Sequence, residues 1–122
     1  MREITLRELQ RYIAEKDNRE GQDYAYFLKL VEEVGELAEA IHAQRRLEGL
    51  PIRDRRSTIE EEAYDVLYYL LVLCNRCGID LTDCAHLKER FNQERFGVNN
   101  DQNGAWGSGA SIHNIFAGEE DA

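Results

Sequence analysis

The sequence is poor in three residue types: its 122 residues include one proline, one tryptophan and three cysteines. A single proline, together with little alternation of β-branched residues, favours helices over a β-rich fold. No segment resembles a signal peptide or the roughly 20-residue apolar run of a transmembrane helix. An odd number of cysteines without a secretory signal is typical of a reducing compartment. We therefore expect a cytoplasmic protein with no membrane partner.

Basic residues are also scarce, since 15 Lys and Arg face 24 Asp and Glu, giving a net charge of −9. A surface that follows a phosphate backbone needs a basic excess, so the composition argues against a nucleic acid polymer as the main partner. The length predicts one domain, small enough to benefit from a partner subunit. The acidic residues are concentrated, with four carboxylates in residues 32–39 and four more in residues 60–65.

The cysteines offer little evidence for a metal site. Cys74 and Cys77 form a CxxC pair, but no second CxxC and no suitably spaced histidine pair completes a zinc site. Small buried thiols on a helix are the favoured interpretation.

Hydrophobic periodicity predicts four helices joined by short loops. The first begins at the capping box formed by Thr5 and Glu8, and the second spans residues 23–47, where the stretch "EGLP" ends it. The second helix carries a wide apolar face made of Phe27, Leu30, Val31, Val34, Leu37, Ala38 and Ile41. We expect this face to pack the core of a helical bundle.

The third helix is predicted to begin at a capping box of Ser57 and Glu60 and to end at Gly78. Its stretch "VLYYLLVLC" is apolar on nearly all sides, which indicates the central and most buried helix. A fourth helix follows over residues 81–96. Residues 98–122 are rich in Gly, Asn and Ser and lack periodicity, so we expect a flexible C-terminal tail after an all-α, four-helix domain of residues 1–97.

Two pairs of carboxylates have the spacing of metal ligands. Glu33 and Glu36 are three residues apart on one predicted helix, and Glu62 and Asp65 are three apart on the next. If these helices are antiparallel neighbours, the four carboxylates converge. Burying them without a partner would be costly, and a hard cation such as Mg²⁺ or Mn²⁺, which prefers oxygen ligands, resolves the conflict. A solvated helix face is the alternative; the matched spacing on two apolar helices favours the metal.

The remaining acidic residues are less informative. Glu60 and Glu61 lie in a first helical turn, where the helix dipole favours acids, and Glu39 is predicted to be solvated. Glu32 is open among three roles: a further ligand, a neighbour that orients the ligands, or a base that orients water. A di-iron bundle would need a Glu-x-x-His motif, but Asp65 stands where the histidine belongs. An all-oxygen site therefore favours Lewis-acid chemistry on phosphates over redox chemistry.

Complementary positive charge lies on the fourth helix. In "KERFNQER", Lys88, Asn92 and Arg95 fall on a single stripe. By itself such a stripe is usually solvated, but beside a carboxylate–metal site it is a reasonable phosphate-binding surface. Three roles remain open for the arginine-rich segment 45–56: it attracts an anionic substrate, it pairs with another subunit, or it is a solvated loop. We assign no site residue to this segment.

Four segments together resemble a known family. "KLVEEVGELAEAI", "EEEAYDVLYYLLVL", "GIDL" and "KERFNQERFG" are similar to the MazG-type nucleoside triphosphate pyrophosphohydrolases. These belong to the all-α NTP pyrophosphatase superfamily, with dCTP pyrophosphatase and phosphoribosyl-ATP pyrophosphohydrolase. The resemblance covers roughly residues 5–97. The family signature ExxE…ExxD falls on Glu33, Glu36, Glu62 and Asp65, followed by Lys88, Asn92 and Arg95.

The resemblance implies a MazG fold and a Mg²⁺-dependent enzyme, with Mn²⁺ as a possible substitute, whose four signature carboxylates hold the metal. A metal-activated water would attack the α-phosphorus of a nucleoside triphosphate, releasing a nucleoside monophosphate and pyrophosphate. The implied role is the removal of surplus or non-standard nucleotides. Lys88 and Arg95 would contact phosphates, Asn92 would contact the nucleotide, and Glu32 stays a candidate catalytic residue. The family also implies a homodimer or a tetramer built as a dimer of dimers.

The sequence leaves the substrate open. The aromatic residues that stack on the base in dCTP-specific relatives have no clear match, and the helical spacing of the candidates Tyr24, Tyr26, Phe27 and Tyr69 favours core packing over base stacking. Phosphoribosyl-ATP pyrophosphohydrolase activity is the alternative within the superfamily. A non-catalytic helical assembly module on the same fold is the alternative outside catalysis.

Overall fold

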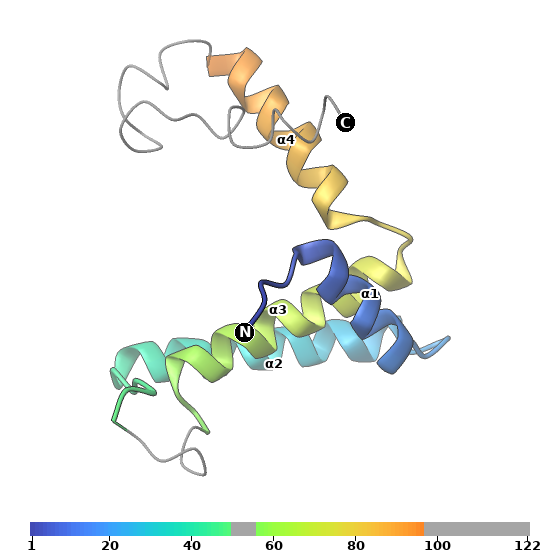
Figure 1. Cartoon of the computed structure of the whole chain (residues 1–122). Helices are drawn as coiled ribbons and strands as arrows, with labels where there is room; N and C mark the ends of the chain where they lie inside the picture. The colour runs from blue at the N-terminus through green and yellow to red at the C-terminus, as the bar shows by residue number, and fades with distance from the viewer. Residues whose placement is uncertain (50–55, 97–122) are drawn as a thin grey trace. The chain divides into compact units, whose positions relative to one another are not determined.

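A computed structural model of the chain describes residues 1–49 and 56–96, which form four helices and no strand (Figure 1). The helices are α1 (Leu6–Lys16), α2 (Asp23–His42), α3 (Ile59–Arg76) and α4 (Leu81–Phe96). The all-α prediction is therefore confirmed. The chain divides into two units, Met1–Asp80 with α1 to α3 and Leu81–Ala122 with α4, and we describe each by itself. The predicted tail and the domain boundary at residue 97 lie outside the described residues.

Helices α2 and α3 run antiparallel, and α3 packs against both α1 and α2 (Figure 1). At one end, the Arg76 guanidinium donates to Asp23 at 2.8 Å; at the other, Arg46 donates to Glu60 at 2.9 Å. Leu71 and Val72 of α3 are fully buried. The prediction that the third helix is central is thus confirmed within the first unit. None of the helices in the described part of the chain is both long and apolar enough to cross a membrane.

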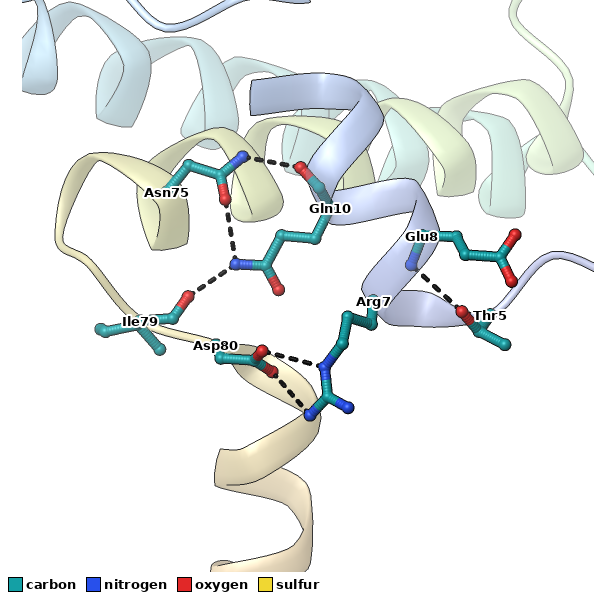
Figure 2. A network of polar contacts seen from close by, with 7 residues as sticks. All are labelled: Thr5, Arg7, Glu8, Gln10, Asn75, Ile79 and Asp80. Atoms are coloured by element: carbon teal, nitrogen blue, oxygen red, sulfur yellow. Dashed lines mark hydrogen bonds and ion pairs between the residues drawn. The ribbon is translucent and has the colours of Figure 1, made fainter. Parts of the chain in front are cut away.

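Helix α1 begins as predicted, with the Thr5 hydroxyl accepting a hydrogen bond from the Glu8 backbone N–H at 3.1 Å. A partly buried amide pair then joins α1 to the end of α3 (Figure 2). Gln10 donates to the Asn75 side-chain oxygen at 3.0 Å and to the Ile79 carbonyl at 2.6 Å, and the Asn75 amide donates back to the Gln10 carbonyl at 3.0 Å. Because these bonds offset the cost of removing the amides from water, the pair fixes α1 against the end of α3.

Asp17, just after α1, ties that helix to the other two. Its carboxylate accepts hydrogen bonds from the Tyr26 hydroxyl at 2.6 Å and from the Tyr68 hydroxyl at 3.0 Å. Burial, followed by these contacts with Asp17, raises the pKa of both phenols. Tyr26, a candidate for base stacking on sequence grounds, is therefore engaged in holding α1 against α2.

The end of α2 differs from the prediction, because the helix stops at His42 and not at residue 47. Gln44 adopts the left-handed conformation with φ 54°; its N–H donates to the Ile41 carbonyl, and the Arg45 N–H donates to the Ala40 carbonyl. These two bonds form a Schellman motif, which ends a helix and usually has glycine in the left-handed position. Because glycine usually ends a helix, the sequence predicted the end of α2 at "EGLP". The helix ends earlier, with Gln44 in the position that glycine usually occupies.

The start of α3 is shifted by one residue from the prediction. Thr58, and not Ser57, is the N-cap, and its buried side chain accepts from the Glu61 backbone N–H at 3.2 Å. Ser57 lies before the helix with φ 64°, a conformation that a serine N-cap does not adopt. The predicted Ser57–Glu60 capping box is therefore wrong, although a Thr58–Glu61 pair of the same spacing takes its place.

The apolar face of α2 is only partly covered. Leu30 and Leu37 are half-buried as expected, but Val34 and Ile41 remain 49% and 53% exposed, so the prediction that these two pack the bundle is wrong for the first unit. Phe27 and Val31 are also about half exposed, at 47% and 52%. Helical geometry explains the result, since a face this wide exceeds what the first unit covers by packing α3 on one side.

Candidate metal and substrate site

Three of the four signature carboxylates meet between α2 and α3. One oxygen each from Glu33, Glu62 and Asp65 lies within 4.8 Å of the others, a spacing that a single cation can bridge. Glu33 comes from the middle of α2, whereas Glu62 and Asp65 come from the first two turns of α3. The antiparallel arrangement assumed from the sequence is what brings them together. We refer to these three residues as the carboxylate cluster.

Glu36 lies one turn after Glu33 on α2 and is half-buried. Its oxygens are not among those that meet within the cluster. Its charge nevertheless acts on the cluster, because it is among the causes that raise the pKa of Glu33, Glu62 and Asp65. It also lines a cavity of about 330 Å³ together with Glu62. Glu36 is thus a neighbour of the cluster on the side of this cavity.

Two of the three carboxylates, Glu33 and Glu62, are buried without enough hydrogen-bond donors, whereas Asp65 is half-buried. Glu33 and Glu62 are only 5% and 4% exposed, and the Oε2 atom of each accepts no hydrogen bond. Burying an unsatisfied carboxylate oxygen costs about 1–3 kcal/mol or more, so such a pair needs compensation. A cation coordinated by these oxygens provides it. The donor set consists of oxygen atoms alone, which suits a hard divalent ion.

Burial and mutual repulsion perturb all three carboxylates. Burial is the main cause for each, followed for Glu62 by the charge of Glu36 and by Glu33, and together they raise the pKa of Glu62 to about 7. The pKa of Glu33 is raised by burial and then by Glu36, and that of Asp65 by burial and then by the charge of Glu61. Such shifts are typical of functional sites, where like charges are held together.

Lys29 and Glu32 lie beside the cluster on α2. The Lys29 ammonium is 3.4 Å from Glu32 Oε1 and 3.6 Å from Glu33 Oε1, so one lysine contacts both acids. Glu32 is exposed, and its carboxylate accepts a hydrogen bond from this lysine. Lys29 was not among the predicted site residues. Its position four residues before Glu33 is nevertheless the spacing of a helical ion pair, which the sequence shows.

Arg45 joins the end of α2 to the start of α3. Its carbonyl accepts from the Ile59 N–H at 2.7 Å, and its guanidinium donates to the carbonyls of Ser57 at 3.1 Å and Arg56 at 3.4 Å. Arg45 and Ser57 also line the cavity that Glu36 and Glu62 border. The arginine thus fixes the chain one turn before Glu62. This contact with backbone carbonyls is not among the three roles left open for the arginine-rich segment, because backbone carbonyls as partners have no sequence signal.

The three predicted phosphate-binding residues lie on α4, in the second unit. Lys88 and Arg95 are exposed and Asn92 is half-buried; the Lys88 ammonium lies 5.6 Å from the centre of the Phe91 ring. Their shared stripe on the helix agrees with the spacing of the sequence. Their approach to the carboxylate cluster stays a prediction.

An all-α domain with a buried, oxygen-only carboxylate cluster between antiparallel helices defines the class of protein. The family model for the MazG nucleotide pyrophosphohydrolase domain matches residues 22–93, a segment that contains the whole cluster. The chain belongs to the MazG nucleotide pyrophosphohydrolase family.

Individual relatives agree with this assignment. The chain is 36% identical over 104 residues to dCTP pyrophosphatase 1 of Mus musculus, and 36% identical over 94 residues to a phosphoribosyl-ATP pyrophosphatase of Pyrobaculum islandicum. The first alignment covers 79% of this chain but 61% of the mouse protein; the second covers 70% and 94%, respectively. The crystal structure of iMazG from Vibrio DAT 722 matches with a TM-score of 0.70 at 40% identity, over 77% of this chain and 99% of that chain.

Proposed function

We propose that this chain is a Mg²⁺-dependent nucleoside triphosphate pyrophosphohydrolase, which cleaves the bond between the α- and β-phosphates and releases a nucleoside monophosphate and pyrophosphate. The single observation that carries the proposal is the carboxylate cluster, with its two buried oxygens that accept no hydrogen bond. Membership of a pyrophosphohydrolase family supports the reaction class. The mouse relative named for dCTP supports a deoxynucleoside triphosphate as substrate.

Glu33, Glu62 and Asp65 would hold the divalent ion, with Glu36 completing the set from the side of the cavity. A divalent ion bound there supplies charge neutralisation for the phosphates and a lower pKa for a coordinated water. Mn²⁺ has similar ligand preferences and is expected to substitute. The protein itself contributes the rigid spacing of the carboxylates, because they project from two packed helices.

Other residues would bind the substrate. Lys88 and Arg95 are suited to phosphate oxygens and Asn92 to the sugar or a phosphate, since all three lie on one stripe of α4. Glu32 is exposed beside the cluster, where it can accept a proton or orient a water; its carboxylate lies 3.4 Å from the Lys29 ammonium. The free thiols of Cys74, Cys77 and Cys84 agree with the predicted reducing, cytoplasmic compartment.

We also propose that the protein assembles as a homodimer or as a dimer of dimers through α2. Its exposed apolar residues recur at alternating spacings of four and three: Phe27, Val31, Val34, Ala38 and Ile41. This is the spacing of a helix–helix seam. A second copy offers the same seam with the same spacing, so a twofold pair of α2 helices would remove it from water.

A screen for pyrophosphate release tests the activity. Purified protein is incubated with each common dNTP and NTP, with and without Mg²⁺, and the nucleotide products are identified. The proposal predicts metal-dependent formation of pyrophosphate and nucleoside monophosphate. Phosphate release without pyrophosphate, or turnover that is indifferent to metal, would contradict it.

Phosphoribosyl-ATP is the second candidate substrate, because a relative named for that reaction is covered over 94% of its length. Including it in the same screen separates the two activities within the superfamily. A non-catalytic assembly module would give neither product and no saturable stabilisation by Mg²⁺.

A further inference from the structure

Lys29 contacts the carboxylate cluster in a way that an ordinary surface lysine does not. Its ammonium lies 3.6 Å from Glu33, whose side chain is only 7% exposed, while the lysine itself is 41% exposed. A helical Lys–Glu pair at this spacing is usually an interaction between two solvated groups. Here one member belongs to a buried set of like charges. The lysine also precedes the glutamate, which is the less favourable order for such a pair on an isolated helix.

The charge of Lys29 reaches beyond α2. Burial raises the pKa of Asp65 on α3, and Lys29 is the neighbour that opposes this shift. Together with its contacts to Glu32 and Glu33, the lysine thus interacts with acids on both helices of the cluster. One positive charge at this point offsets part of the repulsion that the cluster would otherwise experience.

We propose that Lys29 is the counter-ion of the cluster in the metal-free protein and becomes a phosphate-binding residue once a divalent ion is bound. The second half of this inference rests on the proposed function. A bound divalent ion would offset two negative charges of the three-carboxylate cluster and so weaken its attraction for the ammonium. The lysine has a flexible four-carbon stem and a half-exposed side chain, so it can turn to the next anion nearby, which is the triphosphate.

The chain provides a matched control, because it contains only three lysines: Lys16, Lys29 and Lys88. Lys16 lies over the rings of Tyr12 and Tyr68, at 5.5 and 5.3 Å from their centres, whereas the ion pair with the cluster is made by Lys29. Lys16→Met therefore makes the same change of charge and shape as Lys29→Met at a different place. Lys29→Arg keeps the charge and tests whether charge alone is sufficient.

The first measurement is calorimetric titration of metal-free protein with Mg²⁺, which requires no turnover. Removing a competing positive charge should make Lys29→Met bind Mg²⁺ about 3- to 10-fold more tightly than the wild type, whereas Lys16→Met and Lys29→Arg should stay within about twofold. Circular dichroism establishes that each variant is folded. Equal or weaker Mg²⁺ binding by Lys29→Met would overturn the counter-ion role.

The second measurement is steady-state pyrophosphate release at saturating Mg²⁺. Loss of a phosphate contact made equally in the ground and transition states should raise KM for the triphosphate about 10-fold or more with little change in kcat, and Lys29→Arg should restore most of it. An unchanged KM would overturn the phosphate-binding role. If the wild type binds Mg²⁺ and releases pyrophosphate while Lys29→Met matches it in both measurements, only the inference about Lys29 fails. If the wild type does neither, the proposed function fails as well.

Discussion

Glu33 on α2 and Glu62 on α3 each bury one carboxylate oxygen that accepts no hydrogen bond, and both side chains belong to the same cluster. Neither residue stabilises the fold by this arrangement, because burial and like charge both work against it. Buried carboxylates that destabilise the fold are expected mainly at functional sites. The first prediction concerns their metal.

We expect Asp65→Asn and Glu62→Gln to abolish Mg²⁺-dependent pyrophosphate release while leaving the metal-free protein as stable as the wild type or more stable, because each removes a charge from a repelling cluster. For the wild type, Mg²⁺ at about 100 times its dissociation constant should raise the free energy of unfolding by about 2.7 kcal/mol. Thermal unfolding with Mg²⁺ or with EDTA measures both effects. Glu15→Gln, an exposed position on α1, is the control. Variants that keep the full stabilisation by Mg²⁺ would show that the cluster is not the metal site.

The second prediction concerns Gln44, which occupies the left-handed position at the end of α2. We expect Gln44→Gly to raise the free energy of unfolding by roughly 0.5–1 kcal/mol, because glycine adopts positive φ without a clash. Gly78 occupies the equivalent position after α3, with φ 68° and open space around its Cα. Gly78→Ala should therefore destabilise by a similar amount. Urea unfolding curves measure the free energy of unfolding of both variants. If Gln44→Gly and Gly78→Ala changed it in the same direction, the explanation by positive φ would be contradicted.

The third prediction concerns Arg45, whose guanidinium donates to two backbone carbonyls at the start of α3. We expect Arg45→Ala to lower the free energy of unfolding by about 1–2 kcal/mol and to weaken Mg²⁺ binding, since Glu62 follows one turn later. Arg46→Ala is the control, because Arg46 forms an exposed ion pair with Glu60. Calorimetric titration with Mg²⁺ compares the two variants. If Arg45→Ala bound Mg²⁺ as tightly as Arg46→Ala, the prediction that Arg45 supports the metal site would be contradicted.

The fourth prediction concerns the seam of α2. Val34 is 49% exposed at its centre, and we expect Val34→Arg to dissociate the oligomer, because charged side chains would face each other across a twofold axis. Ile4→Arg introduces the same charge at a position that is 65% exposed before α1 and should leave the assembly intact. Sedimentation velocity measures the mass of each protein. A wild type that is monomeric, or a Val34→Arg protein of unchanged mass, would contradict the proposed interface.

The sequence alone determined that the chain is helical, that four helices follow one another and that Glu33 with Glu36, and Glu62 with Asp65, form two pairs of acids three residues apart. Helical periodicity and the spacing of three between acids are local properties, so they can be read from neighbouring residues. The Thr5 cap and the bounds of α4 followed from the same local rules.

Only the tertiary structure decided the features that depend on contacts between distant residues. The Schellman stop at Gln44 and the carbonyl contacts of Arg45 link the end of α2 to the start of α3 through backbone groups, which every residue has and no sequence pattern marks. The exposure of Val34 and Ile41 could not be predicted either, because the sequence of an apolar helix face does not say which of its residues the first unit covers. For Lys29 both levels matter. Its spacing from Glu33 can be read from the sequence, but its contact with a buried carboxylate depends on the packing of Glu33 against α3.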